Sequence, residues 1–243
     1  MKILILGGTG DARELADRLV EMGHDVTTSL AGRTENPVLP KGAIRIGGFG
    51  GADFLAAFLR AEGFERLVDA THPYAARISR NAVTAADAAG IPLVRVVRPG
   101  WAEPKYAFWH HQPDFETAAA RLPRGARALL TIGHAGLDPF LARTDCTFLV
   151  RSIEAPAELL PANAWSILSR PPHFLPEEIA LMKAEKISHL VTKNSGGAAT
   201  EAKLKAAEHL RVAVFMIARP ALPEAIEVQS LGRAIAALHL TSP

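Results

Sequence analysis

The first sixteen residues constrain the fold of this chain more than any other stretch. An apolar run over residues 3–6 leads into a turn that contains three glycines, and an amphipathic pattern follows the turn. This order is typical of a strand, a phosphate-binding loop and a helix. Glycines let the backbone approach a ligand closely, and the first N–H groups of the helix attract a pyrophosphate. The stretch therefore predicts a dinucleotide site formed by Gly7, Gly8, Thr9, Gly10 and Asp11.

The spacing of this turn departs from the usual dinucleotide fingerprint at one position. The fingerprint has a glycine or alanine three residues after the second glycine of its pair, and Arg13 stands there, counted from Gly10. Either the helix begins slightly differently, or Arg13 points outward and joins the binding site. A glycine-rich first turn can also be only a tight connection between strand and helix, so this alternative stays open.

Composition excludes several classes of protein. The 243 residues are 49% hydrophobic and 21% charged, which is ordinary for a globular chain long enough for one large or two small domains. A formal net charge of +2 gives no reason to expect nucleic acid as a partner. No apolar run reaches the length of a membrane span, and no leader pattern is present at the N-terminus. The single cysteine, Cys146, fits a reducing compartment, and we expect a cytoplasmic protein.

The end of the second predicted strand carries information about the cofactor. This strand spans residues 25–30 and stops at Ala31-Gly32-Arg33, which offers no carboxylate and one guanidinium. In Rossmann units an acidic residue here grips a ribose 2′-OH, and a basic residue accommodates a 2′-phosphate. The pattern favours NADPH, with Arg33 near the phosphate, although Arg33 can equally be a solvated loop residue. A third strand over residues 43–46 leads into a second glycine turn, where Gly47 and Gly48 are further cofactor candidates.

A fourth strand, residues 66–70, delivers a polar turn at its carboxyl end. Ligands of open α/β sheets lie outside the carboxyl ends of the strands, so this turn should sit beside the first glycine loop. We therefore expect Thr71, His72, Pro73 and Tyr74 to contact the cofactor, although His72 can also simply cap the next helix. The turn-rich stretch that begins at Arg98 predicts a domain boundary, with a cofactor domain over 1–98 and a second α/β domain over 99–243.

The second half repeats the pattern of strands and helices and contains another polar loop. A strand over residues 188–192 runs into a loop that concentrates an ammonium, an amide and two hydroxyl groups. Such a cluster suits carboxylate or phosphate groups, although a well-capped helix start would look the same. The candidate substrate-binding residues are Thr192, Lys193, Asn194, Ser195 and Gly196, together with Arg13.

Several catalytic signatures are missing from the sequence. Neither Tyr74 nor Tyr106 is followed four residues later by lysine, so the pair used by short-chain dehydrogenases is absent. The sequence also contains no His-x-x-x-His pair and no Gly-x-Ser-x-Gly elbow, so we expect neither metal catalysis nor a serine nucleophile. Hydride transfer needs none of these, because the cofactor carries the chemistry.

Three motifs together resemble one family. The stretches 7–15, 69–75 and 192–197, in this order and spacing, look like the precorrin-6A reductase family of cobalamin biosynthesis. The resemblance covers nearly the whole chain. It implies two Rossmann-like α/β domains, each with a mostly parallel sheet flanked by helices, and an NADPH-dependent reduction of one double bond of the precorrin-6A macrocycle. It also implies that the substrate lies in a cleft between the domains.

The substrate implied by the resemblance is a tetrapyrrole that carries many carboxylates. Lys193, Arg13 and either Arg151 or Arg170 would complement those charges, while His72 is the best-placed proton donor. The catalytic candidates are therefore His72 and Lys193. Transfer of the product to the next enzyme of a pathway is a further expectation. Two alternatives stay open, namely a non-catalytic NADP-binding sensor and a reductase of another small substrate.

Overall fold

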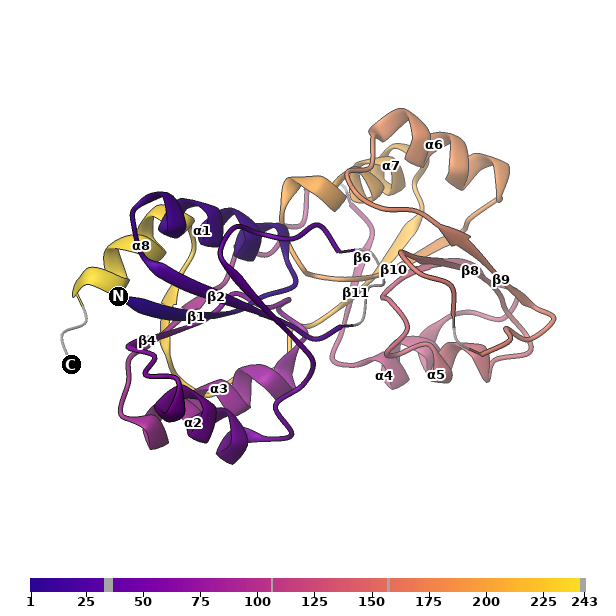
Figure 1. The fold of residues 1–243 in the computed structure, drawn as a ribbon. Coiled ribbons are helices and arrows are strands. Elements are labelled where there is room, and N and C mark those ends of the chain that lie inside the picture. Colours follow the sequence, from indigo (N-terminus) through magenta and orange to yellow (C-terminus); the bar gives the residue numbers. More distant parts are fainter. Residues whose placement is uncertain (33–36, 106, 157, 241–243) are drawn as a thin grey trace. The chain divides into compact units, whose positions relative to one another are not determined.

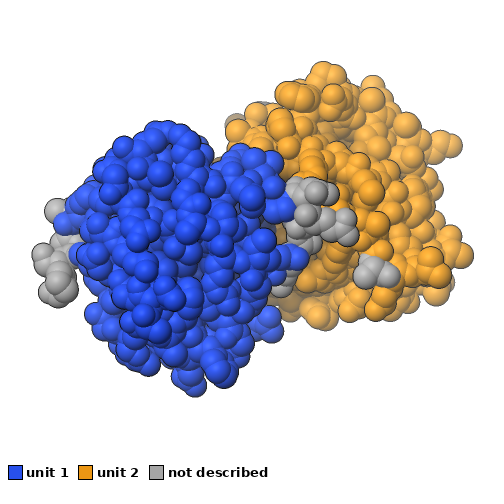
Figure 2. Space-filling view, viewed as in Figure 1, with its two compact units in different colours: residues 1–99, 220–243 blue, residues 100–219 orange. Residues whose placement is uncertain are grey.

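The computed structural model describes residues 1–32, 37–105, 107–156 and 158–240, and these fall into two compact units. The first unit joins Met1–Pro99 to the segment that begins at Pro220, and the second is Gly100–Arg219 (Figure 2). Each unit contains one six-stranded sheet in which all neighbouring strands are parallel. The α/β class with two Rossmann-like sheets, as predicted from the sequence, is confirmed.

The sheet of the first unit has the order β12-β5-β4-β1-β2-β3. Chain order runs outward from β1 to β2 and β3, then returns to the other side of β1 through β4. The direction of winding therefore reverses between β1 and β4, and this reversal is the place where such sheets bind ligands. The strands are β1 (Lys2–Leu6), β2 (Asp25–Leu30), β3 (Ala43–Ile46), β4 (Arg66–Asp69), β5 (Leu93–Val96) and β12 (Ile226–Val228).

Helices cover both faces of this sheet, as Figure 1 shows. α1 (Gly10–Glu21) and α8 (Leu231–Leu240) pack on one face, while α2 (Ala52–Ala61) and α3 (Ala76–Ala89) pack on the other. Side chains of β1 alternate between the two cores, because Ile3 and Ile5 join the first and Leu4 and Leu6 join the second. A strand that is buried on both faces has the continuous apolar pattern found at the start of the chain.

The sheet of the second unit has the order β6-β11-β10-β7-β8-β9, and its winding reverses between β7 and β10. α6 and α7 contribute to the core on one face, and α4 contacts β6 and β11. The strands are β6 (Trp109–Gln112), β7 (Arg127–Thr131), β8 (Thr147–Ser152), β9 (Ala164–Leu168), β10 (His189–Lys193) and β11 (Ala213–Ile217). The helices are α4 (Phe115–Arg121), α5 (Asp138–Leu141), α6 (Leu175–Ala184) and α7 (Ala202–Leu210), with a 3-10 turn η1 (Ala198–Thr200) before α7.

The C-terminal segment corrects the domain division expected from the sequence. The sequence analysis assigns 99–243 to one domain, but β12 pairs in parallel with β5 of the first sheet. Val228, Ala234 and Leu238 complete the core beneath α1. The chain returns to the first unit because apolar surface beside β5 and on the α1 side of the sheet would otherwise stay exposed.

None of the helices in the described part of the chain is long and apolar enough to cross a membrane.

Candidate active site

Two loops lie side by side at the point where the first sheet reverses its winding. One is the glycine loop after β1, and the other follows β4, whose last residue Asp69 is paired with Leu6. The Thr9 hydroxyl donates a hydrogen bond to the Ala70 carbonyl at 2.8 Å and accepts one from the Ala12 N–H at 3.0 Å. Thr9 therefore caps α1 and also fastens the glycine loop to the neighbouring loop.

The glycines of the first loop differ in their surroundings, because one is closely packed and two are open. A Cβ at Gly7 would come within 2.8 Å of Thr28 Cγ2, so close packing against β2 requires a glycine there. Gly8 has φ +104, and a Cβ on Gly8 or Gly10 would meet no described atom within 4 Å. Gly10 and Asp11 begin α1, and their N–H groups have no acceptor within the helix. An open turn with these donors fits a dinucleotide phosphate.

Charged groups flank this turn. The Asp11 carboxylate lies 3.5 Å from the Arg98 guanidinium. The guanidinium offsets the negative charge of Asp11 at the start of α1, where a phosphate would bind. Arg13 is half-buried on α1, so it is not simply a solvated residue. The alternative of a tight connection between strand and helix is compatible with a cofactor role, because Thr9 caps α1 and leaves Gly8 open.

A second glycine turn lies beside the end of β2. Gly47 donates its N–H to the Leu30 carbonyl at 2.9 Å, and Arg45 donates to the carbonyls of Gly47 at 2.6 Å and Gly48 at 3.0 Å. The Arg45 guanidinium also lies 3.8 Å from the centre of the Phe49 ring. A fixed cation therefore supports the turn expected to face the cofactor. Arg33, expected at the 2′-phosphate, lies outside the described residues.

A buried ion pair orients the loop after β4, and the sequence analysis missed it. Arg95 Nε lies 3.3 Å from Asp69 Oδ2, and both side chains are 2% exposed. The other oxygen of Asp69 accepts hydrogen bonds from the Thr71 hydroxyl at 2.7 Å and the Thr71 N–H at 3.2 Å. Arg95 also donates to the Pro223 carbonyl and to Glu227, which ties the C-terminal segment to the same network.

The remaining side chains of this loop reach the surface. His72 is exposed, and its Nδ1 accepts a hydrogen bond from the Tyr74 N–H at 3.3 Å. The rings of His72 and Tyr74 lie 5.7 Å apart, centre to centre. Pro73 and Tyr74 are half-buried beside it.

The polar loop of the second unit also lies at a reversal point. β10 is paired with β7, so the loops after both strands share one end of the sheet. Lys193 Nζ donates to the Ile132 carbonyl and lies 5.5 Å from the centre of the Phe115 ring. Lys193 is half-buried, and its ammonium group crosses from one loop to the other. The placement of this cation at the ligand-binding end of the sheet is the one expected from the sequence.

The other residues of this loop divide into surface and internal groups. Ser195 is half-buried, whereas Thr192 is 1% exposed and Gly196 is also buried. Burial of the Thr192 side chain argues against direct contact with a substrate and favours a supporting role. Both polar atoms of the Asn194 side chain are used within the unit, since Oδ1 accepts from the Trp101 N–H at 2.8 Å and Nδ2 donates to the Trp101 carbonyl at 3.4 Å.

The two arginines considered for substrate carboxylates differ in exposure. Arg151 forms a buried ion pair with Glu178, so the expectation that it faces a substrate is not supported. Arg170 is exposed and lies 2.7 Å from the carboxylate of Glu154. Of the two side chains, only Arg170 remains accessible to an external anion.

A buried lysine lies beside the Arg151–Glu178 pair. Burial, reinforced by the positive charge of Arg151 and opposed by Glu178, lowers the pKa of Lys203 to about 7. Lys203 Nζ donates to the Thr200 carbonyl at 2.7 Å, and it lies 4.6 Å from the centre of the Trp101 ring. The side chain of Lys203 therefore loses its proton and its positive charge near neutral pH.

The depressed pKa of Lys203 makes stability depend on pH. In the unfolded chain Lys203 keeps its proton up to the ordinary value of 10.5, whereas the folded chain releases it from about pH 7. The unfolded state binds more protons between these values, so the free energy of unfolding rises with pH across this window. We expect Lys203→Met to flatten that rise and to stabilise the chain by about 1–2 kcal/mol near pH 7.

Denaturant unfolding at several pH values between 7 and 10 measures this effect. The exposed Lys205, which pairs with Glu201 on α7, provides the matched control, because Lys205→Met should leave the pH dependence unchanged. A wild-type slope retained in Lys203→Met would contradict the assignment.

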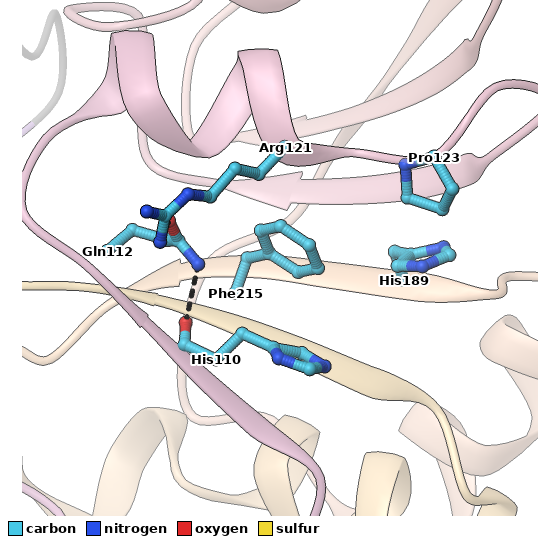
Figure 3. A pocket seen from close by; sticks show the side chains of 6 residues that line it. All are labelled: His110, Gln112, Arg121, Pro123, His189 and Phe215. Atoms are coloured by element: carbon cyan, nitrogen blue, oxygen red, sulfur yellow. Dashed lines mark hydrogen bonds between the residues drawn. The ribbon is translucent and has the colours of Figure 1, made fainter.

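A hollow of about 420 Å³ lies elsewhere in the second unit. Figure 3 shows the Phe215 ring near the imidazoles of His110 and His189, and the Arg121 side chain bends toward Gln112. Burial, and then the charge of His110, lowers the pKa of His189 in this hollow. Residues of β6, β10 and β11 contribute to its lining, and the β10 residue is His189, which begins the strand, whereas Lys193 ends it. Among the described residues no group of His, Cys, Asp and Glu side chains is placed to hold a metal ion.

Two parallel α/β sheets, each with a glycine-rich or polar loop at its reversal point, define a two-unit protein of the Rossmann-like class. The family model described as "Precorrin-6x reductase CbiJ/CobK" matches residues 2–239. The chain belongs to this family, and it is therefore an oxidoreductase.

Individual proteins support this assignment over the full length of the chain. A precorrin-6A reductase from Rhodococcus erythropolis is 49% identical, with 97% of this chain and 96% of the relative covered. A precorrin-6A reductase from Mycobacterium tuberculosis is 42% identical, with 96% and 95% covered. A solved structure of CobK precorrin-6A reductase superposes with a TM-score of 0.93 at 39% identity and covers 98% of this chain and 96% of its own.

Proposed function

We propose that this chain reduces one carbon–carbon double bond of precorrin-6A, in cobalamin biosynthesis, with NADPH as the hydride donor. The observation that carries the proposal is full-length membership in a reductase family, whose relatives at 42–49% identity bear the name precorrin-6A reductase. The open glycine turn at the reversal point of the first sheet supports a nicotinamide dinucleotide as the cofactor.

Residues of the first unit have different roles in binding the cofactor. The open backbone at Gly8 and the first N–H groups of α1 receive the pyrophosphate. Arg45 holds the carbonyls of the Gly47–Gly48 turn, so that turn keeps one shape beside the end of β2. The cofactor supplies a hydride when bound, and the protein supplies orientation and electrostatics.

The polar loop of the second unit is proposed to bind carboxylates of the macrocycle. Lys193 provides an ammonium group, Ser195 a hydroxyl group, and Arg170 an accessible guanidinium near the end of β9. Charged hydrogen bonds of this kind fix the orientation of an anionic ligand. The position of both ligands in a cleft between the domains, product transfer to another enzyme and cytoplasmic location all stay predictions.

One assay separates this function from its alternatives. The protein is mixed with NADPH and precorrin-6A, and loss of the reduced-nicotinamide absorbance is followed, with each compound omitted in turn as a control. We expect oxidation only when both compounds are present. Binding of NADPH without oxidation would instead favour a cofactor-dependent sensor, and oxidation with a different small acceptor alone would favour another reductase.

Arg33 is proposed to select the phosphorylated cofactor. We expect Arg33→Ala to raise the KM for NADPH about tenfold and to leave the KM for NADH unchanged, because only NADPH carries the 2′-phosphate. Steady-state kinetics with both cofactors measures this difference. Arg124→Ala is the control, since that side chain is exposed in the second unit and pairs with Asp145. Equal loss with both cofactors would remove the selective role.

His72 is proposed to supply the proton that completes the reduction. It is exposed in the loop after β4, at the reversal point of the first sheet where the cofactor is proposed to bind. We expect His72→Gln to lower kcat about tenfold with little change in either KM, since solvent replaces a positioned acid only partly. The pH profile of kcat provides the check, because a limb that is present in the wild type and absent from His72→Gln would come from this side chain. Full turnover in the variant would assign the proton to solvent or to the substrate itself.

A further inference from the structure

Trp101 contacts both ends of the polar loop after β10. Its N–H donates to Asn194 Oδ1 at 2.8 Å, and its carbonyl accepts from Asn194 Nδ2 at 3.4 Å. Its indole Nε1 donates to the Gly197 carbonyl at 3.1 Å. One residue, 93 positions earlier in the chain, therefore spans the loop from Asn194 to Gly197.

The neighbours of Trp101 fix both its ring and its backbone. Lys203 Nζ lies 4.6 Å from the centre of the ring, and this lysine is buried in the first turn of α7. A Cβ on Gly100 would come within 3.0 Å of the Asn194 side-chain amide, so a larger residue before Trp101 would require this amide to shift. The indole has only one donor, and that donor is used on Gly197.

Asn194 also connects with the end of the second unit. Arg219 Nε donates to the Asn194 carbonyl at 2.7 Å, and Arg219 is the last residue of this unit. Trp101 follows its first residue, Gly100. The polar loop is thus bonded to the two points at which the chain enters and leaves the unit.

We infer that Trp101 is a positioning residue for substrate binding, which acts through Asn194 and Gly197 on the loop that carries Lys193 and Ser195. This inference rests on the proposed function of that loop as the carboxylate-binding element. Trp101 does not touch the substrate in this role. It restricts the loop to one conformation before binding, and such preorganisation lowers the cost of ordering the loop when the carboxylate arrives.

The test compares two identical substitutions in the second unit. Trp101→Phe keeps an aromatic ring and the backbone bonds to Asn194, but it loses the donor to Gly197. Trp165→Phe is the matched control, because a cation, Arg127, also lies over the Trp165 ring at 4.4 Å, and Trp165 lies on β9. A second variant, Asn194→Asp, keeps the acceptor for the Trp101 N–H, loses the donor to its carbonyl and adds a negative charge to the loop.

Two measurements are made on the full chain. In hydrogen–deuterium exchange without ligands, Trp101→Phe should speed exchange in the peptide over 192–200 relative to wild type and Trp165→Phe. In steady-state kinetics, Trp101→Phe should raise the KM for precorrin-6A about three- to tenfold, the equivalent of one hydrogen bond, with kcat within about twofold and the KM for NADPH unchanged. Asn194→Asp should also raise the same KM, because its added negative charge opposes the carboxylates of the substrate.

The outcomes separate this inference from the function on which it rests. Unchanged loop exchange in Trp101→Phe, or an equal rise in KM in Trp165→Phe, overturns the positioning role. A fall in kcat with constant KM for precorrin-6A overturns it as well. If wild-type protein does not oxidise NADPH with precorrin-6A, the proposed function fails, whereas faster exchange confined to the loop still supports the structural part of the inference.

Discussion

Replacing Asp69 with alanine is expected to lower the free energy of unfolding by about 3–5 kcal/mol, because the buried Arg95 guanidinium would lose its buried partner. The side chains of Asp69 and Arg95 are both buried, so water cannot replace the lost carboxylate. The substitution also removes the acceptor of the Thr71 hydroxyl and N–H groups, which hold the turn that carries His72. We therefore expect the remaining folded protein to bind NADPH more weakly.

Glu227 provides a matched control for this prediction. It contacts the same guanidinium at 3.0 Å, but its side chain is 52% exposed. An exposed pair contributes little, so Glu227→Ala should cost no more than about 1 kcal/mol. Denaturant unfolding followed by circular dichroism gives both values. Equal losses in the two variants would show that burial of Asp69 is not what makes this network important.

Replacing Lys193 with alanine is expected to raise the KM for precorrin-6A about 10- to 100-fold. A hydrogen bond to a charged group contributes about 1.5–3 kcal/mol, which corresponds to this range. The ammonium group also bridges to the Ile132 carbonyl, so part of the loss would come from a looser loop after β7. The KM for NADPH should not change, because the residues proposed to bind the cofactor belong to the first unit.

Two controls distinguish charge from shape at Lys193. Lys193→Arg keeps a cation and should retain part of the affinity, whereas Lys205→Ala removes an exposed lysine of α7 and should have no effect. Steady-state kinetics on the three variants measures the difference. Wild-type affinity in Lys193→Ala would exclude this lysine from carboxylate recognition and leave Arg170 as the accessible cation near the end of β9.

Regular elements with a clear apolar pattern were predictable from the sequence. The strands expected at 25–30 and 43–46 have these bounds in the structure, because local alternation and flanking turn residues determine them. The analysis did not predict β12, which has only three residues and one buried side chain. Its pairing with β5 joins segments more than a hundred residues apart, and no local pattern encodes such a partner.

Apolar spacing was misleading where the core did not extend far enough. Phe54 belongs to the same apolar pattern of α2 as Leu55 and Leu59, yet it is 68% exposed, while the two leucines are fully buried. α6 was also missed, since few of its residues are buried and its pattern is weakly amphipathic. Helical periodicity indicates a face, but the neighbours decide how wide the buried part of that face is.

The candidate site was predictable as a set of loops and not as a network of contacts. Glycines and polar residues after strands located the loops at both reversal points. Trp101 and Lys203 had no local signal, because their importance comes from contacts between distant segments. A charged residue inside an apolar strand, as at Asp69 and Arg95, was the one available sign of a buried ion pair.

Transfer of isotope from the cofactor tests the central claim most directly. The protein is incubated with precorrin-6A and NADPH that carries deuterium at the transferable position of the nicotinamide, and the product is analysed by mass spectrometry. Direct hydride transfer predicts a reduced macrocycle with one deuterium at a ring carbon and one further hydrogen from water. An unreduced macrocycle, or a reduced product without deuterium, would contradict the account.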